Sequence, residues 1–96
     1  MSGREDSMAD SLPLTVEREI NRLCREFEQA WRAGQSPRIE HFAARMSGAA
    51  YVGALRELIA QEVDLRWSAA QSAEPEEYHQ RFSQHTAVVN AAFGLL

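Results

Sequence analysis

The sequence predicts an all-α fold, a small five-helix bundle built from two helix-turn-helix repeats of about 36 residues. Apolar residues recur every three or four positions over two long stretches, which is the spacing of amphipathic helices. Two segments also match 36 residues apart, WRAGQS at 31–36 and WSAAQS at 67–72. That period is typical of a helix pair that must stack on a neighbour to bury its apolar face. No stretch alternates apolar and polar residues as strands do, so we expect no sheet.

The first repeat unit, about residues 16–47, contains a long helix followed by a short one. Its apolar stripe advances by steps of four, three, four and four residues: Val16, Ile20, Leu23, Phe27 and Trp31. This stripe predicts a helix from about Thr15 to Ala33, with Thr15 as N-cap and Gly34 as the C-terminal stop. Ser36 followed by Pro37 is typical of a helix start and predicts a short helix from Pro37 to about Met46.

The second unit, about residues 52–83, has a broader set of apolar positions. Its members are Val52, Leu55, Leu58, Ile59, Val63 and Trp67, widened by Tyr51 and Leu65. This width predicts a central helix with neighbours on two sides. Pro75 predicts the start of a short helix that ends near Phe82, and Ser83 is the expected N-cap of a closing helix at 84–94.

Length and composition favour one domain. The chain has 96 residues, of which 45% are apolar and 25% charged, as is usual for small globular proteins. Residues 1–12 are polar and aperiodic, so we expect a flexible N-terminal arm there and a single helical domain at 13–96.

Charge and hydropathy exclude two classes of partner from the prediction. A net charge of −4 without a basic cluster argues against nucleic acid, whose phosphates require a positive surface. No stretch approaches the roughly 20 apolar residues of a membrane span, so we expect no membrane partner. A single cysteine and the lack of an apolar leader favour the reducing cytoplasm.

The side chains that could carry chemistry do not form a motif, and we predict no catalytic, cofactor-binding or metal-binding residue. Glu76 and His79 have the Glu-x-x-His spacing of di-iron bundles, but such sites need the pair twice, and the first unit has Ala43 in place of the second His. None of the three histidines has a Ser or Cys nucleophile beside it in a recognisable motif. Cys24 lies on the flank of an apolar stripe, as a small hydrophobe would; a reactive thiol beside Arg25 is the alternative.

Four aromatic residues are the candidates for contact with a partner protein: Trp31, Phe42, Trp67 and Tyr78. Tryptophan is enriched at interface hot spots. The alternative is that each tryptophan anchors the short helix of its own unit while its indole N–H stays near a polar loop. Phe42 and Tyr78 hold matching positions in the two short helices, and packing within each unit would explain both.

Two pairs of opposite charges lie four residues apart on the long helices, Glu28 with Arg32 and Glu62 with Arg66. On exposed faces such pairs stabilise a helix by about 0.2–0.5 kcal/mol. We expect both pairs to be exposed to solvent and to belong to no site.

The segment CREFEQAWRAGQSPRIEHF at 24–42 resembles the helical region that precedes the catalytic domain in many bacterial, eukaryotic-like serine/threonine protein kinases. The segments LRELIAQEVDLR at 55–66 and EPEEYHQRFSQH at 74–85 resemble the later parts of that region, so the likeness runs from about Ile20 to Phe93. It implies a position ahead of a kinase domain and no catalytic residue. The chain itself has no Gly-rich phosphate loop, no Lys, no His-Arg-Asp and no Asp-Phe-Gly.

We therefore expect a noncatalytic, helical interaction or regulatory module of such a kinase, whose partner is the kinase domain or its substrate. The chain itself is not expected to be an enzyme, although a longer parent protein could be a serine/threonine kinase. The alternative is a freestanding helical adaptor or homodimer in which Leu95 and Leu96 form a self-complementary patch. A small enzyme is the third hypothesis.

Overall fold

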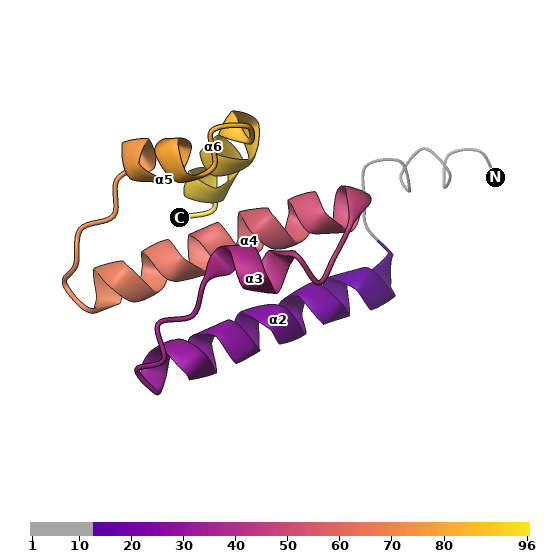
Figure 1. The fold of residues 1–96 in the computed structure, drawn as a ribbon, viewed down its shortest axis with the longest axis horizontal. Coiled ribbons are helices and arrows are strands. Elements are labelled where there is room, and N and C mark those ends of the chain that lie inside the picture. The colour runs from indigo at the N-terminus through magenta and orange to yellow at the C-terminus, as the bar shows by residue number, and fades with distance from the viewer. Residues whose placement is uncertain (1–12) are drawn as a thin grey trace.

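The computed structural model describes residues 13–96, which contain helices and no strand (Figure 1). The helices are α2 (Leu14–Arg32), α3 (Ile39–Ala43), α4 (Gly48–Ser68), α5 (Pro75–Arg81) and α6 (Thr86–Gly94). The all-α class and the order of long, short, long, short and closing helix are confirmed over this range. The predicted N-terminal arm, residues 1–12, lies outside the described residues.

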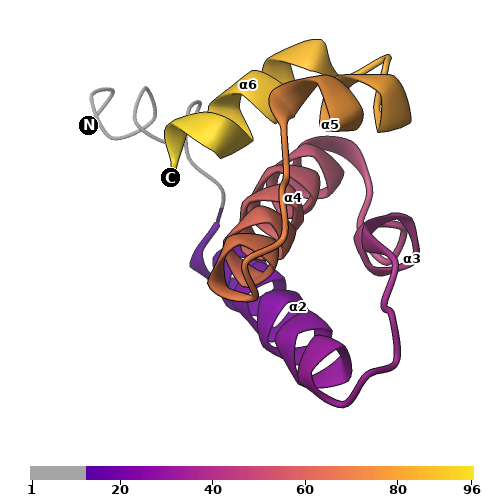
Figure 2. The same cartoon turned by 90° about the vertical axis from the view of Figure 1, so that its left-hand side faces the viewer.

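Helix α4 lies at the centre of the bundle. α2 runs along it, α3 packs against both long helices, and α5 packs on α6, which in turn lies on α4 (Figure 1). Figure 2 shows α6 above α4 and reaching to the upper left, α5 at the upper right, α3 at the right and α2 below. Within residues 13–96, one side of α4 stays exposed; it carries Val52, Asp64 and Trp67, and we call it the open side of α4.

The two long helices bury their surfaces in different ways, as their patterns predict. α2 buries a single stripe, Ile20, Leu23 and Phe27. α4 buries side chains over most of its circumference: Ala54, Leu55, Leu58, Ile59, Glu62, Val63 and Leu65. These apolar residues and those of the other three helices form one continuous core, so each helix depends on its neighbours for burial.

Both long helices end in the same hydrogen-bonded turn, and this turn is what the matching hexapeptides encode. In α2 the Gly34 N–H donates to the Trp31 carbonyl and the Gln35 N–H to the Ala30 carbonyl, each at 3.0 Å. In α4 the Ala70 N–H donates to the Trp67 carbonyl at 3.0 Å and the Gln71 N–H to the Arg66 carbonyl at 2.8 Å. This is the Schellman motif, which requires a left-handed residue after the helix. Gly34 supplies it with φ +77° and Ala70 with φ +60°.

The N-termini depart from the predicted caps. α2 begins at Leu14 behind Pro13, not behind Thr15, because the Pro13 carbonyl already accepts the Glu17 N–H at 3.0 Å. Thr15 therefore lies inside the first turn, and no side chain caps this helix.

Two further helices begin later than predicted. α3 is confined to Ile39–Ala43 because Ser36 has φ +52°, in the left-handed region, and cannot act as an extended N-cap. α6 begins at Thr86 behind His85, not at Ser83, because the chain turns at 82–84 and the His85 N–H donates to the Phe82 carbonyl at 2.9 Å. Pro75 does open α5, as predicted.

Candidate functional site

The four aromatic candidates occupy different environments. Trp31 and Phe42 are half-buried, and each packs against the buried Phe27 with ring centroids 6.3 and 5.5 Å apart. Trp67 is 47% exposed and its ring edge meets Phe93 of α6 at 6.4 Å. Among the aromatic rings, Trp31 thus pairs with Phe27 of its own helix α2, and Trp67 pairs with Phe93 of the closing helix α6.

Tyr78 lies in the core and offers no surface to a partner. Its side chain is fully buried, with its ring 5.7 Å from that of Phe93. The hydroxyl donates to Oε1 of Glu62 at 2.6 Å and accepts from Nη1 of Arg66 at 2.9 Å. Burial raises the pKa of the Tyr78 hydroxyl, and the hydrogen bond to Glu62 raises it further, so the proton stays on the phenol. The packing interpretation of Tyr78 describes this environment, and the partner-contact interpretation does not.

The predicted exposed pair of Glu62 with Arg66 is wrong. Glu62 is only 6% exposed, and its Oε1 takes hydrogen bonds from Tyr78 and from Nη1 of Arg81, the latter at 2.8 Å. Arg66 instead binds both carboxylate oxygens of Glu77, at 2.6 and 3.0 Å, and the carbonyl of Ser72. The reason is that α5 brings Tyr78, Glu77 and Arg81 over this part of α4. The other pair, Glu28 with Arg32, forms as predicted at 2.7 Å.

Arg81 connects three helices. From the end of α5 it reaches Glu62 of α4, and its Nη2 lies 3.3 Å from Oε1 of Glu40 in α3. Its guanidinium also lies over the Tyr78 ring at 5.4 Å. Hydrogen bonds from its own backbone and from Arg81 outweigh partial burial and lower the pKa of the Glu40 carboxyl.

The hydrogen bonds among Glu62, Tyr78, Arg66 and Arg81 form a buried polar network that holds α5 on α4. Among residues 13–96, no buried side-chain nitrogen or oxygen lacks a hydrogen-bond partner. One oxygen of the Glu62 carboxylate, Oε1, receives both the phenol of Tyr78 and the guanidinium of Arg81. Sequence reasoning missed this network, although one signal was present: Glu62 lies within the broad apolar set of α4, between Ile59 and Val63.

Two further side chains that could take part in chemistry are Cys24, which is unreactive, and His79, which is hydrogen-bonded. Cys24 is half-buried, and burial, reinforced by the nearby Glu57, raises the pKa of its thiol to about 11. The thiol is therefore protonated at neutral pH and a poor nucleophile. Nε2 of His79 lies 2.9 Å from Oδ1 of Asn90. Residues 13–96 contain no group of three or more His, Cys, Asp or Glu that could hold a metal ion.

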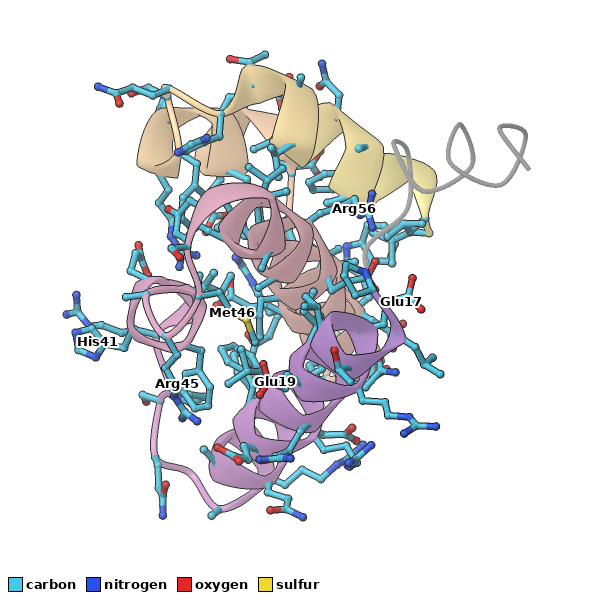
Figure 3. All side chains as sticks on the ribbon, turned by 90° about the vertical axis from the view of Figure 1, so that its right-hand side faces the viewer. Glu17, Glu19, His41, Arg45, Met46 and Arg56 are labelled. Carbon is cyan, nitrogen blue, oxygen red and sulfur yellow. The ribbon has the colours of Figure 1, made fainter. Side chains whose placement is uncertain are left out.

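An exposed apolar cluster lies near the C-terminal ends of α4 and α6. Its members are Trp67, Leu95 and Leu96, and the most exposed of them, Leu95, is 55% accessible. Val52 is also exposed, about 22 Å away in the first turns of α4. Leu95 and Leu96 border an open depression of about 420 Å³ that α4 lines with Glu57, Ala60, Gln61 and Asp64. Figure 3 shows Arg56 of α4 projecting on this side of the molecule, whereas His41 and Arg45 lie on the opposite side with α3. Of the four aromatic candidates, only Trp67 belongs to this cluster.

Comparisons with protein-family models, with curated proteins and with solved structures found no match to this chain. In the described part of the chain, no helix combines the length and apolar character that crossing a bilayer requires.

Proposed function

We propose that the chain is a noncatalytic helical module that acts by binding another protein chain. The observation that carries this proposal is the exposure of Trp67, Leu95 and Leu96 near the ends of α4 and α6. Exposed surface formed by several neighbouring large apolar side chains marks binding sites more often than single exposed side chains do. Tryptophan is also among the residues most often found at interface hot spots.

The state of the polar side chains supports a noncatalytic role. The Cys24 thiol is protonated at neutral pH, and the buried Glu62 is occupied by Tyr78 and Arg81. The depression beside Leu95 and Leu96 is lined by two carboxylates, an amide and apolar groups, and its lining contains no Ser, Cys, His or Lys.

The resemblance of residues 20–93 to the region preceding bacterial serine/threonine kinase domains supports a more specific form of the proposal. In that form the module is a cytoplasmic regulatory part of such a kinase, and its partner is the kinase domain or its substrate. A homodimer is the second candidate, favoured by the exposure of Leu95 and Leu96 beside Trp67.

Site-specific photo-cross-linking in the cells that produce the protein tests the proposal. A photoreactive amino acid replaces Trp67 in one variant and the exposed His41, on the opposite side, in a control. We expect covalent adducts from position 67 and few from position 41. An adduct of twice the mass of the chain identifies a homodimer, and a heavier adduct can be checked for a kinase sequence by mass spectrometry. Equal labelling at both positions, or none at 67, contradicts the proposal.

A further inference from the structure

The open side of α4 carries a regular series of side chains. Val52, Arg56, Ala60 and Trp67 follow one another at helical spacing, with Asp64 beside them. Residues at this spacing share one face of a helix. Val52, Asp64 and Trp67 are exposed, and Ala60 is half-buried at the floor of the depression. The face thus has a small residue at its middle and larger residues toward both ends.

The charges on this face are arranged symmetrically about Ala60. Arg56 lies four residues before it and Asp64 four residues after it. Arg56 contacts Glu57 at 3.3 Å in an exposed pair of adjacent residues, which contributes little to stability. Asp64 forms no ion pair with any residue of the range 13–96. The same face therefore offers one positive and one negative group at equal distances from its centre.

We propose that the open side of α4 binds a second copy of this chain, with the two α4 helices antiparallel and crossing at Ala60. In an antiparallel pair related by two-fold symmetry, residues equally far before and after the crossing point face each other. Arg56 then faces Asp64 of the second copy, and by symmetry Asp64 faces Arg56 of the second copy. Arg56 lies between that carboxylate and its own Glu57. This inference rests on the proposed function, because it names the partner of the same surface.

The apolar residues fit the same register. Trp67 lies seven residues after Ala60 and therefore meets the other helix near the exposed Val52 of the second copy. Val52 gives the indole an apolar contact. Ala60 facing Ala60 allows the close approach of about 8–10 Å between helix axes that packing requires. Leu95 and Leu96, on the rim of the depression, become covered when the second copy stacks on this side.

A charge exchange tests the register. Sedimentation velocity on the full chain over a range of concentrations gives the dissociation constant of the dimer. We expect Arg56→Glu and Asp64→Arg each to raise it about tenfold or more, since each places like charges opposite one another. The double variant restores opposite charges and should return close to the parent value. Arg22→Glu, at an exposed position on α2, is the control and should leave it unchanged.

A cysteine scan gives an independent reading of the crossing point. In a Cys24→Ser background, Ala60→Cys should form a disulfide between two chains on mild oxidation, because equivalent residues meet on the symmetry axis within disulfide range. His41→Cys, on the opposite side, should remain monomeric. Far-UV circular dichroism establishes that each variant is folded.

Two results would overturn the inference. A chain that stays monomeric at every concentration has no self-association, and cross-links from position 67 to a different protein would then leave the proposed function intact. A dimer whose affinity is indifferent to the single charge reversals and whose Ala60→Cys variant does not cross-link uses another surface.

Discussion

The two halves of the molecule make the same ionic contact in different surroundings. In the first half, Arg45 binds Glu26 at 2.9 Å, and both side chains are about half exposed. In the second half, Arg81 binds Glu62 at 2.8 Å, with Glu62 almost wholly buried. The members of each pair are 19 residues apart, and the two pairs lie 36 residues apart in the chain. Each arginine also lies over an aromatic ring, Arg45 over Phe42 and Arg81 over Tyr78.

The difference follows from the helices that carry the two acids, because Glu62 lies on α4, which is buried over most of its circumference, and Glu26 lies on α2, which buries a single stripe. Among residues 13–96, the second half also has the additional helix α6. Phe93 of α6 packs on Tyr78, whereas Phe42 stays half-buried. A pair in water contributes little, because solvent can replace either partner. A carboxylate that is withdrawn from water depends on its partners, because losing one leaves a desolvated charge. We therefore expect the Arg81–Glu62 pair to contribute more to the free energy of unfolding than the Arg45–Glu26 pair.

The largest contrast is expected between Arg81→Met and Arg45→Met. Removing Arg81 deprives the buried Glu62 of its cation, which we expect to cost about 2–3 kcal/mol of unfolding free energy because Tyr78 still donates one hydrogen bond. Removing Arg45 breaks an exposed pair and should cost no more than about 1 kcal/mol. Urea unfolding followed by circular dichroism measures both. Equal losses would show that burial of Glu62 has no energetic role.

A smaller contrast is expected between removing the hydroxyl of Tyr78 and adding a hydroxyl to Phe42. Tyr78→Phe leaves Glu62 and Arg66 each without one hydrogen-bond partner, and we expect a loss of about 1–2 kcal/mol. Phe42→Tyr adds a hydroxyl to a half-buried ring and should change stability by less than about 0.5 kcal/mol. The same unfolding measurement applies. A neutral Tyr78→Phe would mean that Arg81 alone satisfies the carboxylate.

The smallest contrast concerns the two helix ends. Ala70→Gly should stabilise the protein by about 0.5–1 kcal/mol, because alanine is strained at a positive φ. Gly34→Ala should destabilise it by a similar amount, since a methyl group there meets no other atom within 4 Å and only the backbone conformation opposes it. Thermal unfolding resolves changes of this size in a small domain. A destabilising Ala70→Gly would indicate that this turn is not left-handed in solution.

The helices could be predicted from the sequence because their apolar periodicity is strong. The single stripe of α2 and the broad apolar set of α4 correctly indicated that α4 is the more buried helix, although Val52 and Trp67 of that set are exposed. Gly34 marked a helix end, as predicted.

The N-termini were predicted less well. Thr15, Ser36 and Ser83 are favourable N-caps by residue type, but none of them caps a helix. The helix of Thr15 begins earlier, behind Pro13, and Ser36 adopts a left-handed conformation. Ser83 lies in a turn that precedes α6. The 36-residue repeat remains an interpretation of the sequence.

The polar core was not predicted because local spacing suggested a simpler explanation. Glu62 and Arg66 are four residues apart, so an exposed pair within the helix was the expected arrangement. The actual partners, Tyr78 and Arg81, come from α5, and only the three-dimensional packing brings them to Glu62. Of the residues selected for partner contact, Trp67 is exposed, and its contact with a partner stays a prediction; Tyr78 was selected by its sequence position and is buried.

The reach of Arg81 from α5 to Glu40 in α3 bears on how the molecule loses its structure. Chains made of stacked helix pairs tend to open one unit at a time, because each unit contacts only its neighbours. Arg81 bridges residues 41 positions apart and ties the short helix of one half to that of the other. Both short helices therefore share contacts with Arg81, the guanidinium that pairs with the buried Glu62, and detaching either one changes the surroundings of Arg81. Amide hydrogens of α3 and α5 should accordingly exchange with solvent in a single cooperative step, and the chain should unfold as one unit.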